Sequence, residues 1–150
     1  MTDQIAAQDR KRWLSLLATA DEGQLAQLWQ DSGRAPAFRW LRTPEAGGVM
    51  VRGRAGGTGA PFNLGEMTVT RCSLALENGT VGHGYVQGRS KAKAEIAAKV
   101  DALMQTDCSE DLRAQILNPL ADAQHKARTT RAAKAAATKV EFFTLVRGED

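Results

Sequence analysis

The dipeptide Asn78-Gly79 is the feature that most restricts how this chain folds. It lies between two β-favouring runs, residues 67–76 and 80–86. A type I′ turn needs positive φ at both central positions, which Asn and Gly tolerate best. We therefore expect an antiparallel hairpin with a two-residue loop. Three cross-strand pairs then share one sheet face: Leu76 with Val81, Leu74 with His83, and Cys72 with Tyr85.

This register gives the hairpin one apolar face and one face rich in small residues. The second face carries Arg71, Ser73, Ala75, Gly82, Gly84 and Val86. Because glycine has no side chain, another backbone or a ligand can approach such a face closely. We expect the first face to be core and the second to be a contact surface. His83 then lies on the apolar face as a hydrogen-bonded core residue, and a general base is the alternative because imidazole titrates near neutrality.

Helical patterns flank the strand region on both sides. Residues 1–35 read as a helical hairpin, with a capping box at Asp21 and a stop at Gly33. Residues 90–139 are helical again, beginning at a Ser90 cap and carrying an i,i+4 pair of Glu95 and Lys99.

The remaining segments predict further strands. Two short β-favouring runs, 38–42 and 49–52, are separated by Pro44 and two glycines. Residues 140–148 are β-favouring, with apolar residues at both odd and even positions. Both faces of a strand with this pattern need to be covered by other parts of a protein. The expected fold is α+β in a single domain over residues 1–150. It has an N-terminal helical hairpin, an antiparallel β-sheet of about four strands, and a long C-terminal helical segment ending in a β-strand.

The composition predicts a hydrophobic core with little buried apolar area. The chain is 43% hydrophobic, but 25 of those residues are Ala, which leaves 39 larger apolar side chains. Hydrophobic stabilisation scales with buried apolar area at about 25 cal/mol per Å². Such a chain is typical of a subunit that draws part of its stability from a neighbour.

Several protein classes are excluded by simple criteria. No stretch approaches the roughly 20 apolar residues of a membrane span, and the N-terminus has no secretory signal. Two cysteines, Cys72 and Cys108, are too few for a disulfide scaffold, so we expect a cytoplasmic protein. Together with His83 and His125 they lack the short paired spacings of zinc ligands, so no metal is expected.

The glycine-rich stretch between the expected strands predicts an anion site. Consecutive glycines let backbone N–H groups converge on an anion, and two arginines precede them. The candidate residues are Arg52, Arg54, Gly56, Gly57, Thr58 and Gly59. No Gly-Lys-Ser/Thr follows, so this is not a P-loop. The alternative is a flexible loop between two strands.

A basic segment near the C-terminus supports a second function. Five Lys or Arg and no acid occur between Ala123 and Val140. Such a helix can track the phosphates of nucleic acid or hold a polyphosphate. No aromatic residue is interleaved with these charges, which argues against single-strand binding. A solvated or partner-facing helix explains the pattern equally well.

Beyond these local features, an ordered set of segments resembles one family. The set comprises Val51–Arg71, Asn78–Gly82, Tyr85–Arg89 and Val140–Gly148, and Trp13 and the Asp101–Gln105 helix fit as well. The chain resembles the PhnG family over nearly its whole length. That family is the G subunit of the bacterial carbon–phosphorus lyase system for phosphonate use.

The resemblance implies an accessory role in a complex. PhnG chains assemble with H, I and J subunits, with the I subunit expected closest. The complex forms α-D-ribose 1-methylphosphonate 5-triphosphate from ATP and methylphosphonate with release of adenine, in organic phosphonate catabolism. It implies no cofactor in this chain, and no catalytic residue is carried over. A stand-alone phosphate-binding or acid–base enzyme ranks second, and a nucleic-acid module third.

Two parts of the chain then acquire expected roles. The Arg52–Gly59 loop would contribute to a phosphonate or triphosphate pocket shared with another subunit. The C-terminal segment would bind the I subunit through Phe142, Phe143, Leu145 and Val146.

Overall fold

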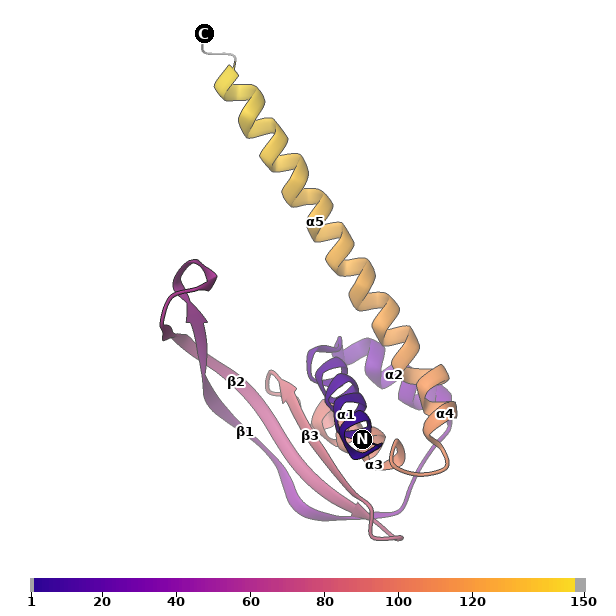
Figure 1. Ribbon diagram of the computed structural model, residues 1–150. Coiled ribbons are helices and arrows are strands. Elements are labelled where there is room, and N and C mark those ends of the chain that lie inside the picture. The colour runs from indigo at the N-terminus through magenta and orange to yellow at the C-terminus, as the bar shows by residue number, and fades with distance from the viewer. Residues whose placement is uncertain (1, 148–150) are drawn as a thin grey trace.

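The computed structural model describes residues 2–147 and places its helices over one face of a small sheet (Figure 1). The long elements are α1 (Thr2–Thr19), α2 (Glu22–Ser32), β1 (Phe38–Arg54), β2 (Pro61–Leu76), β3 (Val81–Gln87), α3 (Lys91–Leu103) and α5 (Asn118–Arg147). Between α3 and α5 lie a short helix α4 (Ser109–Leu112) and a single π-helical turn (Arg113–Leu117). The α+β class is confirmed.

The expected helix boundaries agree with the structure where local chemistry sets them. The Asp21 side chain accepts a hydrogen bond from the Gln24 backbone N–H, and Gly33 ends α2 with φ +68°. Ser90 caps α3 by accepting from the Lys93 backbone N–H at 3.0 Å. Within α3, Lys99 Nζ lies 3.2 Å from Glu95 Oε1, so the predicted pair is confirmed.

The sheet has three antiparallel strands in the order β1-β2-β3, so the expectation of about four is wrong by one. The two short runs 38–42 and 49–52 belong to one continuous strand, β1. Register shifts between Trp40 and Arg42 and between Arg42 and Glu45 absorb Pro44. Because the ladder is already interrupted there, the missing proline N–H does not break the strand.

The predicted register of the β2–β3 hairpin is wrong by one residue. Leu74 pairs with Gly82 and Cys72 with Gly84. The Gly79 N–H donates to the Leu76 carbonyl, and the Leu76 N–H donates to the Thr80 carbonyl, both at 2.9 Å. Gly79 has φ +88°, whereas no described non-glycine residue has positive φ. The loop is therefore a three-residue type I turn with a glycine bulge, and not a type I′ turn.

This shift exchanges the glycines and the histidine between the two faces. A Cβ added at Gly82 would lie 2.0 Å from the Ala98 carbonyl oxygen, and one at Gly84 would lie 2.2 Å from that of Ala94. The small residues thus admit a close backbone, as predicted, but that backbone is α3 of the same chain. His83 is exposed on the opposite face, so its expected place beside Leu74 is wrong.

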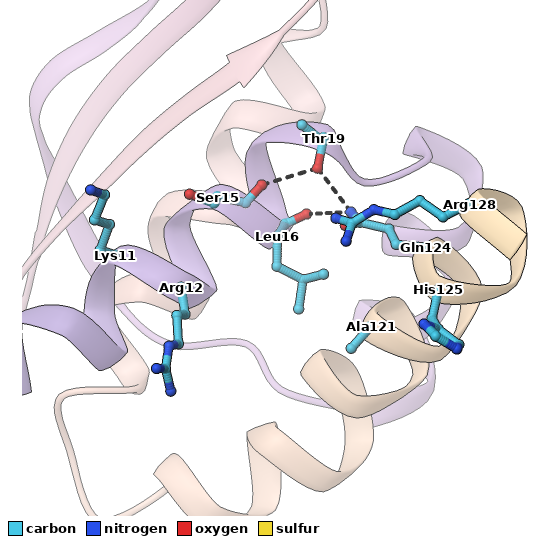
Figure 2. A pocket seen from close by; sticks show the side chains of 9 residues that line it. All are labelled: Lys11, Arg12, Ser15, Leu16, Thr19, Ala121, Gln124, His125 and Arg128. Atoms are coloured by element: carbon cyan, nitrogen blue, oxygen red, sulfur yellow. Dashed lines mark hydrogen bonds between the residues drawn. The ribbon is translucent and has the colours of Figure 1, made fainter. Parts of the chain in front are cut away.

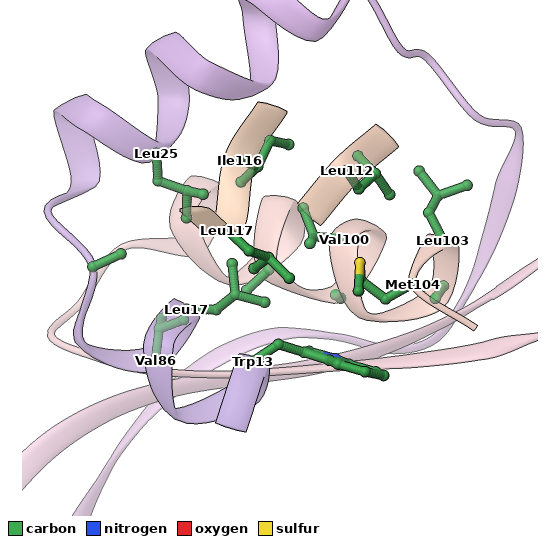
Figure 3. Close-up of a cluster of buried hydrophobic side chains, with 14 of the residues drawn as sticks. Trp13, Leu17, Leu25, Val86, Val100, Leu103, Met104, Leu112, Ile116 and Leu117 are labelled. Carbon is green, nitrogen blue, oxygen red and sulfur yellow. The ribbon is translucent and has the colours of Figure 1, made fainter. Parts of the chain in front are cut away.

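The hydrophobic core lies between this sheet face and the helices (Figure 3). Its fully buried large apolar side chains come from α1, α2, the sheet, α3, α4, the π turn and the first turn of α5. They are Leu17, Leu25, Leu74, Val86, Val100, Leu112, Ile116 and Leu120. Alanines of α3 complete the contact with the sheet: Ala94, Ala97, Ala98 and Ala102.

Two elements extend beyond this core (Figure 1). The first, here called the arm, is residues 49–67, where β1 and β2 pair only with each other because β3 reaches no further than Val69. The second, here called the free helix, is residues 125–139 of α5, all of which are exposed. The chain stays helical to Arg147, so the expected C-terminal β-strand is wrong. The side chains of Phe142, Phe143, Leu145 and Val146 lie outside the described residues.

Candidate functional site

The structure brings the six predicted anion-site residues together at the tip of the arm. Arg52 and Arg54 end β1, and a short 3₁₀ turn, Ala55–Gly57, follows. Gly56 and Gly57 have φ of +63° and +78°, a conformation that favours glycine. Thr58 and Gly59 lead into β2. Both arginines are exposed, and among the described residues neither takes part in an ion pair.

This tip is open to solvent. A Cβ added at Gly56 or Gly57 would meet nothing within 4 Å, so backbone conformation, and not crowding, requires glycine there. Exposed arginines and backbone N–H groups can bind an anion, but an exposed loop does not exclude water from it. A neighbouring surface is needed to complete a selective pocket.

The sides of the arm carry apolar side chains that the chain leaves uncovered. Met50 is 57% exposed, Phe62 45% and Leu64 62%. Arginine, aromatic residues and methionine are enriched where protein surfaces meet, whereas lysine and glutamate are depleted. The arm therefore has the composition of an interface element.

A buried carboxylate joins three elements of the body. Asp101 of α3 is fully buried and accepts hydrogen bonds from Arg10 and from Trp13 Nε1, the latter at 2.8 Å. The backbone N–H of His83 donates to its other oxygen, also at 2.8 Å. The hydrogen bond to Asp101 raises the pKa of Arg10. Since every partner comes from within the fold, this cluster positions α1 and β3 against α3.

Sequence reasoning did not single out Asp101 as a buried group. A signal was available, because Asp101 lies three or four residues from Ala97 and Met104 and so falls on the buried face of α3. A charged residue inside an otherwise apolar helical face indicates a buried partner on another element.

The two residues that could act as a base or nucleophile do not form a catalytic pair. The Cys72 thiol is buried, its Sγ donates to the Ala94 carbonyl at 3.2 Å, and burial raises its pKa to about 11. A thiol of this kind stays protonated and unreactive at neutral pH. His83 projects on the other side of the sheet. Within residues 2–147 no three His, Cys, Asp or Glu side chains gather as metal ligands.

A second candidate site lies between α1 and α5 (Figure 2). It is a groove of ≈ 590 Å³ with basic side chains on both walls, Lys11 and Arg12 from α1 and His125 and Arg128 from α5. Only the α5 half was visible in the sequence as part of a basic segment. The two walls are far apart along the chain, and the fold alone brings them together.

None of the described helices is both long enough and apolar enough to span a membrane.

Two kinds of comparison with known proteins agree. The family model for "Phosphonate metabolism protein PhnG" matches residues 8–148. A protein of Rhizobium meliloti (strain 1021) is 43% identical over 153 residues, which cover 99% of this chain and 96% of that protein. It is named alpha-D-ribose 1-methylphosphonate 5-triphosphate synthase subunit PhnG. The expected resemblance is confirmed over both the arm and the body: this chain belongs to the PhnG family of phosphonate metabolism proteins.

Proposed function

We propose that this chain is an accessory subunit of a cytoplasmic α-D-ribose 1-methylphosphonate 5-triphosphate synthase. It supports formation of that product from ATP and methylphosphonate, with release of adenine, in organic phosphonate catabolism. The name of the Rhizobium meliloti relative supports the assignment to such an enzyme. The observation that carries the subunit role is that the arm and the free helix leave the core without packing on it.

Neither element is expected to be stable by itself. An isolated helix of about 12–15 residues is marginal in water, because nucleation is costly and tertiary packing supplies most helical stability. A lone two-stranded ribbon is also marginal. Residues 125–139 are all exposed, and residues 49–67 expose Met50, Phe62 and Leu64. Folded partners that cover both elements would provide the missing stabilisation.

The partners we propose are the H, I and J subunits of the carbon–phosphorus lyase core complex, with the I subunit closest. The proposed contact residues are Phe142, Phe143, Leu145 and Val146. They belong to the last turns of α5, the helix that leads away from the core, and this direction supports the proposal. ATP and the phosphonate are substrates of the complex, and this chain is proposed to hold no cofactor of its own.

The arm tip is proposed to contribute to the substrate pocket from one side. Arg52 and Arg54 offer guanidinium groups that suit phosphonate or phosphate oxygens. The open tip becomes a closed site when another subunit covers it. In that arrangement this chain binds and orients the anion, and the reacting groups come from the neighbouring subunit.

Co-expression tests the subunit role directly. The tagged chain is produced together with untagged H, I and J subunits and purified through its tag. We expect the other subunits in fixed proportion. The same tagged chain produced alone is the control, and we expect it to be less stable. Recovery of a well-folded solitary monomer from the co-expression would contradict the proposal.

Substitution of the arm arginines tests the pocket. Arg52→Ala and Arg54→Ala should leave assembly intact and lower synthase activity by about tenfold or more, since a hydrogen bond to a charged group contributes about 1.5–3 kcal/mol. Arg89→Ala, an exposed arginine of the body, is the matched control and should keep full activity. Loss of assembly in the arm variants would show that the tip is a structural contact instead.

A second candidate, a nucleic-acid-binding module, is favoured by one observation. All five basic residues of the free helix are exposed: Lys126, Arg128, Arg131, Lys134 and Lys139. Binding of this kind weakens steeply as salt rises, because counterions are released from the phosphates. Titration of a short duplex at two salt concentrations tests it, and no binding at low salt would exclude it.

A further inference from the structure

We propose that the groove between α1 and α5 binds the phosphate chain of a small polyphosphate compound, such as inorganic triphosphate or a nucleoside triphosphate. This site is separate from the arm tip. The proposal depends on the packing of α1 against α5, and it stands whether or not the chain assembles with other subunits.

The groove is fixed because the first turns of α5 are anchored. Leu120 is buried in the core. One turn further, Gln124 Nε2 donates to the Leu16 carbonyl at 3.1 Å and to Thr19 Oγ1 at 2.9 Å (Figure 2). These contacts hold the base of α5 against the C-terminal half of α1, so the basic side chains above them have defined neighbours.

The groove gathers positive charge without a compensating acid. Its lining contains Lys11, Arg12, His125 and Arg128 and no Asp or Glu. On α1, by contrast, the neighbouring Arg10 is neutralised, because its Nη2 lies 2.8 Å from an Asp101 oxygen. Among the described residues, the three permanently charged groove side chains, Lys11, Arg12 and Arg128, take part in no ion pair. Their mutual repulsion is relieved when an anion binds between them.

The remaining lining suits a small polar ligand more than a long polymer. A volume of ≈ 590 Å³ falls in the usual range for small-molecule sites. Ser15 adds a hydroxyl group that can donate a hydrogen bond to a phosphate oxygen. In Figure 2 the Arg128 side chain reaches back across Gln124 toward α1. Because cationic groups lie on both walls, we expect a chain of several phosphates to offer each wall an anionic oxygen.

Calorimetric titration of the full-length chain at physiological salt tests the proposal. The probes are inorganic triphosphate, ATP and adenosine. We expect one equivalent of triphosphate and one of ATP to bind, and adenosine not to bind. Binding of ATP but not of triphosphate would place the affinity in the nucleoside and overturn the proposal, as would no binding of either.

Two double variants distinguish binding in the groove from non-specific attraction to positive charge. Arg12→Ala combined with Arg128→Ala should weaken triphosphate binding by at least about tenfold. Lys134→Ala combined with Lys139→Ala removes the same charge from the free helix and should change the affinity by less than about twofold. Equal losses in the two pairs would show non-specific attraction. Circular dichroism confirms that each variant is folded.

Chemical modification of Lys11 reports on the groove even when the chain is part of a larger complex. Lys11 is exposed, so a lysine-acylating reagent should modify it, and triphosphate should slow that modification several-fold. Lys134, which does not line the groove, serves as the internal control. Equal acylation rates at Lys11 with and without triphosphate would overturn the proposal.

Discussion

The guanidinium of Arg10 donates two hydrogen bonds to the carboxylate of Asp101, from Nε to Oδ1 at 3.1 Å and from Nη2 to Oδ2 at 2.8 Å. The indole N–H of Trp13 and the backbone N–H of His83 each add another. Both oxygens of this fully buried carboxylate are therefore satisfied twice. The cluster ties α1 and β3 to α3, which is how the wall of the α1–α5 groove is positioned.

Asp101→Asn should destabilise the fold severely. An amide nitrogen would replace one acceptor and point its own hydrogens at a donor, leaving buried groups unpaired. We expect a loss of about 3–5 kcal/mol in the free energy of unfolding, measured by urea denaturation. Asp122→Asn, on the exposed side of α5, is the control and should change stability by less than about 0.5 kcal/mol. A loss below about 1 kcal/mol at Asp101 would contradict this account.

Gly82→Ala and Gly84→Ala should each lower the free energy of unfolding by about 1–3 kcal/mol or more, because the new methyl groups would collide with carbonyl oxygens of α3. Backbone atoms cannot move aside as a side chain can. Gly65→Ala on the arm is the matched control, since an added Cβ there meets nothing within 4 Å. If thermal melts rank Gly65→Ala as the most damaging of the three, the register described above is wrong.

Local chemistry made part of this fold predictable. The Asp21 and Ser90 caps and the Glu95–Lys99 pair depend on residues within one helical turn of each other. The anion-loop residues all lie between Arg52 and Gly59 in the sequence, so any hairpin there would bring them together. The location of the β2–β3 turn was equally clear from Asn78-Gly79.

Tertiary contacts determine the features of the fold that local sequence patterns did not predict. The hairpin register depends on the packing of Gly82 and Gly84 under α3, and two turn types one residue apart both fit Asn78-Gly79. The segment after residue 139 favours strand by composition, yet it continues the Ala-rich α5, and helix propagation is cooperative. The groove joins side chains from the two ends of the chain, so no local pattern could indicate it.

The buried Cys72 thiol should resist alkylation at neutral pH. Burial raises its pKa from 9.0 to about 11, so almost no thiolate is present and the sulfur is inaccessible. We expect iodoacetamide to modify only the half-buried Cys108 in the native chain, as read by mass spectrometry, and to modify both cysteines in urea. The Cys108→Ser variant isolates the Cys72 signal. Rapid native modification of that variant at neutral pH would show that Cys72 is accessible.

The same thiol should make folding stability depend on alkaline pH. The folded state holds the thiol proton more tightly than the unfolded chain, so this contribution is fully present below pH 9 and is lost as pH rises through about 11. Cys72→Ala should remove that part of the pH dependence, whereas Cys108→Ser should leave it. Urea denaturation at pH 8 to 11 measures the difference, and identical pH profiles for all three chains would contradict it.

Deletion of residues 140–150 should prevent assembly with the I subunit and leave the stability of the chain nearly unchanged. The core ends at Leu120, and residues 125–139 are exposed, so a chain ending at Lys139 should unfold at nearly the same temperature as the full chain. It should nevertheless fail to copurify with the I subunit, because the proposed contact residues Phe142 and Phe143 are gone. A chain ending at Leu117 also removes Leu120 from the core and should lose about 2–5 kcal/mol of stability. Copurification of the chain ending at Lys139 in full amount would place the interface on the arm or the sheet instead.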